Sequence, residues 1–209
     1  MKTVIYLIRH SEQLKIKSEI HSHDSDQVKN EKIVLSVRGE EKAKEFSKKE
    51  ELKKIDVVYA SHYTRAIATA KYIAEENQLE INIDERLGER RLGDLQTLKE
   101  ALKNCDGDPS TLQLIDENLK NASGESNLEV RARMAECIEE LIQKHEGKTL
   151  AVISHGGAIR FLLMKWCQYN AETNSFSFQE QKIFQGQLET PSALKLIFEG
   201  KELIEVHQI

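Results

Sequence analysis

The stretch Thr3–Ile8, TVIYLI, is a nearly continuous run of apolar and β-branched residues, and Arg9-His10-Ser11-Glu12 follows it directly. Such an uninterrupted run is typical of a strand buried on both faces, as in a parallel sheet covered by helices. Thr149–Ile153, TLAVI, has the same character, and Asp56–Ala60 and Ile81–Ile83 are shorter candidates. The sequence therefore predicts a mostly parallel central sheet that begins close to the N-terminus.

Segments with helical spacing alternate with these strands. A capping box, Ser126-x-x-Glu129, marks the start of one of them. The tail, Ala193–Phe198 and Leu203–His207 around Glu-Gly-Lys, indicates a hairpin. This alternation of strands and helices predicts an α/β fold, a three-layer α/β/α sandwich. We expect helices over Arg38–Glu51, Thr64–Glu76, Leu128–His145 and Ala158–Trp166.

The length of 209 residues is enough for one domain, and we predict a single domain over residues 1–209. Two segments fit the alternating pattern poorly. Ser18–Asn30 is polar and is predicted to be a flexible loop. Leu95–Gly124 mixes helical and turn signals, and we predict that residues 95–124 are an insertion that caps a site.

The formal net charge of -5 argues against nucleic acid or an anionic membrane as a standing partner, since both need a basic surface. No apolar run reaches the length of a membrane span, and the N-terminal segment is predicted to be a strand rather than a signal peptide. Cys105, Cys137 and Cys167 are widely spaced and form no CxxC pair. This usage favours a reduced, cytoplasmic setting.

Residues that can carry chemistry follow several of the predicted strands. In an open α/β sheet, ligands bind beyond the carboxyl ends of the strands. Arg9 and His10 follow the first strand, and Arg65 lies one turn into the helix after the Asp56 strand. The Ile81 strand leads toward Glu89, and the Thr149 strand leads into His155-Gly156-Gly157. We expect these residues to meet at one edge of the sheet.

This combination suits phosphoryl transfer to a histidine. Arginine is permanently charged, and its planar group pairs with phosphate oxygens in a bidentate manner. A neutral histidine keeps a lone pair on one ring nitrogen and can act as a nucleophile. A glutamic acid can protonate the leaving oxygen when burial or a neighbouring anion keeps it protonated. Adjacent glycines at a helix N-terminus let the backbone approach an anion closely.

The sequence resembles the histidine phosphatase family, also called the phosphoglycerate mutase-like family, over almost the whole chain. The resemblance rests on six motifs in the family's order. They are Leu7-Ile8-Arg9-His10-Ser11-Glu12, Leu35-Ser36-Val37-Arg38-Gly39, Ser61-x-x-x-Arg65-Ala66-x-x-Thr69-Ala70, Leu87-x-Glu89-x-x-x-Gly93, Gly124-Glu125-Ser126 and Ser154-His155-Gly156-Gly157-x-Ile159-Arg160.

The resemblance implies a role for each matching residue. His10 is expected to be the phosphorylated nucleophile and Glu89 the proton donor to the leaving group. Arg9, Arg65 and His155 are expected to bind the phosphate, without a metal or cofactor. Two further phosphate-binding predictions are Gly156, for close backbone approach, and Ser11, which replaces the family's usual glycine and could narrow the pocket or donate a hydrogen bond to phosphate.

The family contains phosphatases and mutases, and the sequence favours a phosphatase acting on a small phosphomonoester. The mutase branch has an Asn where this chain has Ile16 and a Tyr where it has Leu92. It also has an Arg-Arg pair in the insertion after the acid motif, whereas Leu95–Gly124 contains no arginine. The segment after the acid partly matches the mutase pattern, at Arg90, Leu92, Gly93, Leu95 and Gln96. A mutase therefore stays the alternative prediction.

The sequence disfavours two other functions. A non-catalytic module on the same fold would have lost the nucleophile, an arginine or the acid, and this chain keeps all of them. A metal site at His21-x-His23-Asp24 is disfavoured, because residues of this kind in a polar loop are more often solvated and no further ligands stand at a recognisable spacing.

Overall fold

The computed structural model describes residues 1–15, 23–94 and 116–209. The main sheet contains β1 (Lys2–Arg9), β2 (Val57–Ala60), β3 (Ile81–Ile83), β4 (Thr149–Ser154), β8 (Ser192–Glu199) and β9 (Glu202–Gln208). The helices are α1 (Asp26–Lys32), α2 (Val37–Phe46), α3 (Thr64–Asn77), α6 (Asn127–Lys144) and α7 (Gly156–Leu163), with short 3-10 turns η2 (Glu50–Leu52) and η3 (Glu85–Leu87). A second, smaller sheet contains β5 (Gln168–Asn170), β6 (Ser175–Phe178) and β7 (Gln181–Gln185).

The six-stranded sheet has the order β3-β2-β4-β1-β8-β9. Strands β1 to β4 are parallel to one another, and β8 and β9 extend the sheet in antiparallel fashion from β1. The predicted α/β fold with a mostly parallel central sheet is thus confirmed, and so is the terminal hairpin. β1 and β4 lie at the centre of the sheet because their apolar runs can be buried on both faces.

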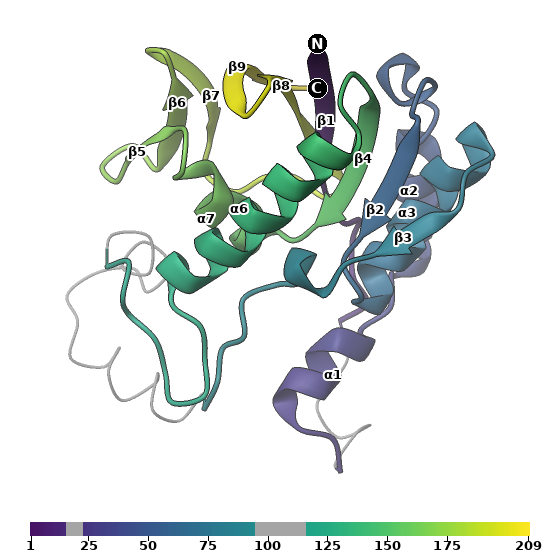
Figure 1. Cartoon of the computed structure of the whole chain (residues 1–209). Coiled ribbons are helices and arrows are strands. Elements are labelled where there is room, and N and C mark those ends of the chain that lie inside the picture. The colour runs from purple at the N-terminus through teal and green to yellow at the C-terminus, as the bar shows by residue number, and fades with distance from the viewer. Residues whose placement is uncertain (16–22, 95–115) are drawn as a thin grey trace.

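Alternate residues of the central strands face two separate cores. In β1, Ile5 and Leu7 belong to the core beneath α6 and α7, whereas Tyr6 and Ile8 belong to the core on the face of the sheet that α3 covers. β4 divides its apolar side chains between the two cores in the same way. Figure 1 shows the resulting layers, with α6 and α7 on one face of the sheet and α2 and α3 on the other. This arrangement leaves the strand ends as the place where polar groups can gather.

The carboxyl ends of β1, β2 and β4 point toward the same edge of the molecule, away from the two termini (Figure 1). Helix α1 lies beyond that edge, although most of it falls within the predicted loop Ser18–Asn30. Ser25 caps α1 by accepting a hydrogen bond from the N–H of Val28, and no residue of the helix is buried. A short helix without an apolar face gives no periodic signal, which is why the loop prediction was wrong over Asp26–Asn30.

Several other predictions meet the structure only in part. The helix expected over Arg38–Glu51 ends at Phe46 and is followed by η2. Most of the predicted insertion, residues 95–115, lies outside the described residues, so its capping role stays a prediction. The described remainder runs beside the segment after η3, where the N–H of Asp94 donates to Ala122 O and that of Glu125 to Arg91 O.

Cys137 and Cys167 are buried free thiols, and burial raises the pKa of each to about 12. Thiols that stay protonated in this way are chemically inert. Cys105 lies outside the described residues, and the reduced, cytoplasmic setting stays a prediction. In the described part of the chain, none of the helices combines the length and the apolar character needed to cross a membrane.

Candidate functional site

His10 lies directly after β1, where its own N–H donates to Ser154 O of β4 at 3.0 Å. The residue is only 5% exposed. Its Nδ1 lies 2.7 Å from Ser11 O, and Nε of Arg65 lies 3.1 Å from its Nε2. Because the arginine nitrogen can only donate, Nε2 accepts and Nδ1 carries the proton. The structure therefore presents the lone pair of Nε2 to the side where Arg65 lies.

Two arginines flank this ring. Arg65, in the first turn of α3, is buried, and its guanidinium lies 4.8 Å from the centroid of the Tyr63 ring. It also donates to the carbonyl of Asn30 in α1. Arg9, at the end of β1, donates to Leu188 O. The Nε of Arg9 is buried and has no hydrogen-bond partner among the described residues, so it is a donor available to a ligand.

His155 completes the group at the end of β4. It is fully buried, its Nε2 lies 2.8 Å from Oγ of Ser61, and its ring centroid lies 5.0 Å from that of His10. Its Nδ1 has no hydrogen-bond partner within the described residues. The predicted residues Arg9, His10, Arg65 and His155 are therefore brought together, at the ends of β1 and β4 and at the start of α3.

The electrostatics of this pocket keep the histidines neutral. Burial lowers the pKa of His10 from 6.5 to about 3, and the charges of Arg65 and Arg9 add to this effect. Burial, followed by the influence of His10 and Arg65, holds the pKa of His155 well below its usual range. Burial also lowers the pKa of both arginines, but guanidinium groups remain charged in proteins. The pocket thus holds a neutral imidazole, with a lone pair on Nε2, beside two fixed cations.

Glu89 reaches the pocket from the segment after η3. Its carboxylate accepts hydrogen bonds from the N–H groups of Gly157 at 3.2 Å and Ala158 at 2.9 Å, at the N-terminus of α7. A Cβ at Gly157 would lie 2.7 Å from Oε1 of Glu89, and one at Gly156 would lie 2.9 Å from Nε of Arg9. The glycine pair is therefore needed for the close approach of Glu89 and Arg9 to this helix end.

Ser11 is hydrogen-bonded to the protein through both its hydroxyl and its N–H. Its hydroxyl donates to Gly39 O at 2.7 Å, and its N–H donates to Oγ1 of Thr69 at 2.9 Å. Both polar groups thus join the loop after β1 to helices α2 and α3. Contact of Ser11 or Gly156 with phosphate stays a prediction.

Two groups of residues near the site were not predicted from the sequence. Tyr63 packs against both Arg65 and His155, with ring centroids of Tyr63 and His155 4.6 Å apart. Its position two residues before Arg65 in a matched motif was the available signal. Arg133 of α6 and Glu125 hold the segment that carries Glu89. Glu125 had a signal, since it lies in the Gly-Glu-Ser motif. Arg133 had none, because arginines on helices are usually solvated.

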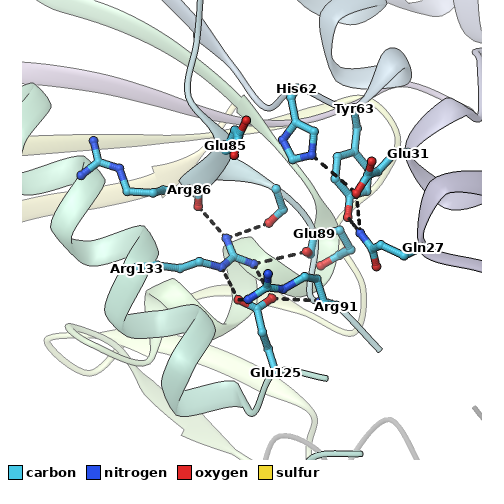
Figure 2. A pocket seen from close by; sticks show the side chains of 11 residues that line it. Gln27, Glu31, His62, Tyr63, Glu85, Arg86, Glu89, Arg91, Glu125 and Arg133 are labelled. Carbon is cyan, nitrogen blue, oxygen red and sulfur yellow. Dashed lines mark hydrogen bonds and ion pairs between the residues drawn. The ribbon is translucent and has the colours of Figure 1, made fainter. Parts of the chain in front are cut away.

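A cavity of about 280 Å³ opens beside Glu89 (Figure 2). Its walls carry polar side chains and charges of both signs. They are formed by Gln27, Glu31, His62, Tyr63, Glu85, Arg86, Gly88, Glu89, Arg91, Glu125 and Arg133. This cavity, the cleft, therefore adjoins Glu89 and presents both acidic and basic side chains. The part of the chain that the structure describes has no cluster of three or more His, Cys, Asp and Glu side chains arranged to hold a metal ion.

The low pKa of His10 predicts a pH-dependent stability. Below pH 6.5 the unfolded chain protonates this side chain, whereas the folded chain does so only near pH 3. The unfolded state then binds more protons, so the free energy of unfolding falls as the pH is lowered from about 7 toward 4. The free energy of unfolding can be measured by urea titration at a series of pH values, and its slope against pH is then compared between variants. His10→Asn should reduce this slope by up to about 1.4 kcal/mol per pH unit.

The control is His207→Asn, because the His207 side chain is 45% exposed and lies far along the chain in β9. It should leave the slope unchanged. Equal slopes for the wild type and His10→Asn would show that His10 is not held neutral by the fold.

Comparisons with known proteins relate the chain to a family. Residues 5–185 match the histidine phosphatase superfamily, branch 1. Phosphoglycerate mutase-like protein 4 from Arabidopsis thaliana is 35% identical over 116 residues, 52% of this chain. The chain covers only 49% of that protein's length. A probable phosphoglycerate mutase from Erwinia tasmaniensis is 28% identical over 161 residues, 76% of this chain and 72% of that protein.

Solved structures share the fold. A mycobacterial glucosyl-3-phosphoglycerate phosphatase superposes with a TM-score of 0.70 at 21% identity, over 100% of this chain and 97% of its own. A phosphoglycerate mutase from Bacillus anthracis does so with a TM-score of 0.65 at 18% identity, over 100% and 92%. Since the family match spans most of the chain, the protein belongs to branch 1 of the histidine phosphatase superfamily.

Proposed function

We propose that the protein is a phosphomonoester hydrolase that works through a phosphohistidine on His10. The observation that carries this proposal is the state of the His10 ring. It is buried and neutral, and its Nε2 lone pair faces Arg65. A nucleophile for phosphorus needs this lone pair and a cationic surrounding that offsets the charge of the transferred group.

In the proposed first step, Arg9, Arg65 and His155 bind the phosphate, and the Arg65 N–H that now points at His10 turns to a phosphate oxygen. Nε2 of His10 attacks phosphorus while the bond from phosphorus to the ester oxygen breaks. Glu89 donates a proton to that oxygen, so the product leaves as a neutral alcohol. In this scheme Glu89 carries the transferred proton when the first step begins.

In the second step, water attacks the phosphorus of phospho-His10. Glu89, now a carboxylate, accepts a proton from the water as the bond from nitrogen to phosphorus breaks. Inorganic phosphate leaves, and His10 returns to its neutral state. No residue other than Glu89 has to exchange a proton with the substrate, and the ring of His10 keeps its Nδ1 proton throughout.

The charge of the cleft favours hydrolysis over the mutase alternative. A mutase has to bind a second phosphate, which calls for cations that are free of protein partners. Arg86 donates to Asp84 and Glu140, Arg90 donates to Glu125 O and Leu119 O, and Arg91 lies 3.3 Å from Glu125. Glu31 and Glu85 line the same cleft. A phosphomonoester with an uncharged remainder fits these walls better than a bisphosphate.

The nucleophile is tested by the release of inorganic phosphate from p-nitrophenyl phosphate and a panel of phosphomonoesters, with excess chelator present. His10→Ala is expected to abolish turnover, because the phosphoryl group then has no acceptor at the position of the His10 Nε2 lone pair. His207→Ala, the control, should retain wild-type turnover. Release that persists in His10→Ala would refute the scheme, whereas 2,3-bisphosphoglycerate-dependent isomerisation without phosphate release would favour the mutase.

The proposed role of Glu89 as the acid is tested by comparing the rates of Glu89→Gln on two substrates with different leaving groups. Loss of a general acid costs about 100-fold or more when the leaving group is a poor alkoxide, and much less when it is a stable phenolate. We therefore expect a loss of about 100-fold in the first turnover of β-glycerophosphate and a far smaller loss for p-nitrophenyl phosphate. Rapid mixing isolates this turnover from the later attack of water. Equal losses for both substrates would contradict the proton-donor role.

A further inference from the structure

The segment that carries Glu89 is held from outside by one arginine of α6. Beyond the short turn η3, this segment has no strand or helix of its own. Nη1 of Arg133 donates to Arg86 O at 2.6 Å and to Gly88 O at 3.0 Å, and its Nη2 lies 3.2 Å from Glu89 O. Figure 2 shows the Arg133 guanidinium directed into the bend of this segment. One side chain thus bonds to the backbone of Glu89 and to that of its neighbours.

Glu125 fixes the orientation of this guanidinium. Its Oε1 lies 2.8 Å from Nε of Arg133, and its Oε2 lies 3.0 Å from Nη2, so the pair is bidentate. The same Oε2 accepts the N–H of Arg91 at 3.0 Å. The Glu125 side chain is 6% exposed, and that of Arg133 is 19% exposed. The pair therefore brackets Glu89, with Arg133 on the carbonyls before it and Glu125 on the N–H two residues after it.

The carboxylate of Glu89 is held at its other end by α7, through the N–H groups of Gly157 and Ala158. The hydrogen bonds of Arg133 and Glu125 to the backbone, and those of α7 to the carboxylate, together determine where the carboxylate lies relative to His10. A general acid has to lie within hydrogen-bond reach of the leaving oxygen, and a displacement of about 1 Å can cost on the order of 100-fold in rate. Stability alone does not require that all these bonds converge on one short segment.

We propose that Arg133, oriented by Glu125, is a positioning residue that holds Glu89 where it can protonate the leaving oxygen. The proposal rests on the proposed function, because it assumes that Glu89 is the acid. Lysine cannot replace Arg133 in this role, since its single ammonium group cannot reproduce the planar, bidentate pattern of donors. The positioning is therefore lost in Arg133→Lys although the positive charge is kept.

The test compares Arg133→Lys with Glu89→Gln by the ratio of first-turnover rates for β-glycerophosphate and p-nitrophenyl phosphate. Arg133→Lys should slow the alkyl substrate by about tenfold or more and the aryl substrate by less than about threefold. In the double variant the alkyl loss should equal that of Glu89→Gln alone, because residues that act as a unit are not additive. All rates are measured below the melting temperature of every variant.

The matched control is Arg131→Lys. Arg131 lies on the same helix and forms its ion pair with Glu117 at 2.8 Å instead. This variant should leave the ratio unchanged. Glu125→Gln provides a second test if Arg133→Lys does not fold, because an amide has one acceptor oxygen where the carboxylate uses two. It should lower the same ratio.

The possible outcomes distinguish failure of the positioning role of Arg133 from failure of the proposed function. A selective loss in Glu89→Gln without one in Arg133→Lys or Glu125→Gln overturns the positioning role and leaves the function intact. Equal losses on both substrates in Arg133→Lys, or additive losses in the double variant, also overturn it. If Glu89→Gln itself shows no selectivity, the role of Glu89 fails and the positioning role fails with it.

Discussion

The hydrogen bond between Nδ1 of His10 and the carbonyl of Ser11 is the constraint on which the chemistry of this site depends. At 2.7 Å in a buried pocket, it fixes the proton on Nδ1 and leaves the Nε2 lone pair facing Arg65. The loop that supplies this carbonyl is anchored by the other groups of Ser11, which bond to Gly39 O and Thr69. The tautomer is therefore set by the way two helices pack beside the end of β1.

The two-sided burial of β1 and β4 explains why the charged groups stay together. Both faces of these strands are covered by apolar cores, so polar side chains are accommodated only at the strand ends. There Arg9 and Arg65 lower the pKa of His10 further than burial alone would. The cost of burying these charges is offset by hydrogen bonds to Leu188 O and Asn30 O, and the remaining donors suit an anion.

The sequence allowed a good prediction of the central sheet and of the residues at its edge. Strongly apolar runs such as Thr3–Ile8 leave few alternatives to a buried strand, and polar residues directly after them must lie at a strand end. Helix α1 could not be predicted, because it has no buried face and is stabilised by its Ser25 cap. The small sheet was missed because its strands are short and mostly polar, with Phe176 stacked on Phe184 as their buried contact. Arg133 lacked any signal, since its partners are three backbone carbonyls and the Glu125 carboxylate, which only the fold brings near it.

Under the proposed mechanism, hydrolysis and isomerisation would share a first step, the transfer of a phosphoryl group to His10. The most direct test is to stop the reaction with p-nitrophenyl phosphate by rapid alkaline quench and to map phosphorylation by mass spectrometry. The account predicts one acid-labile phosphoryl group on the peptide that contains His10, and none in His10→Ala. Substrate turnover with no phosphorylated peptide, or with the phosphoryl group on another residue, would contradict it.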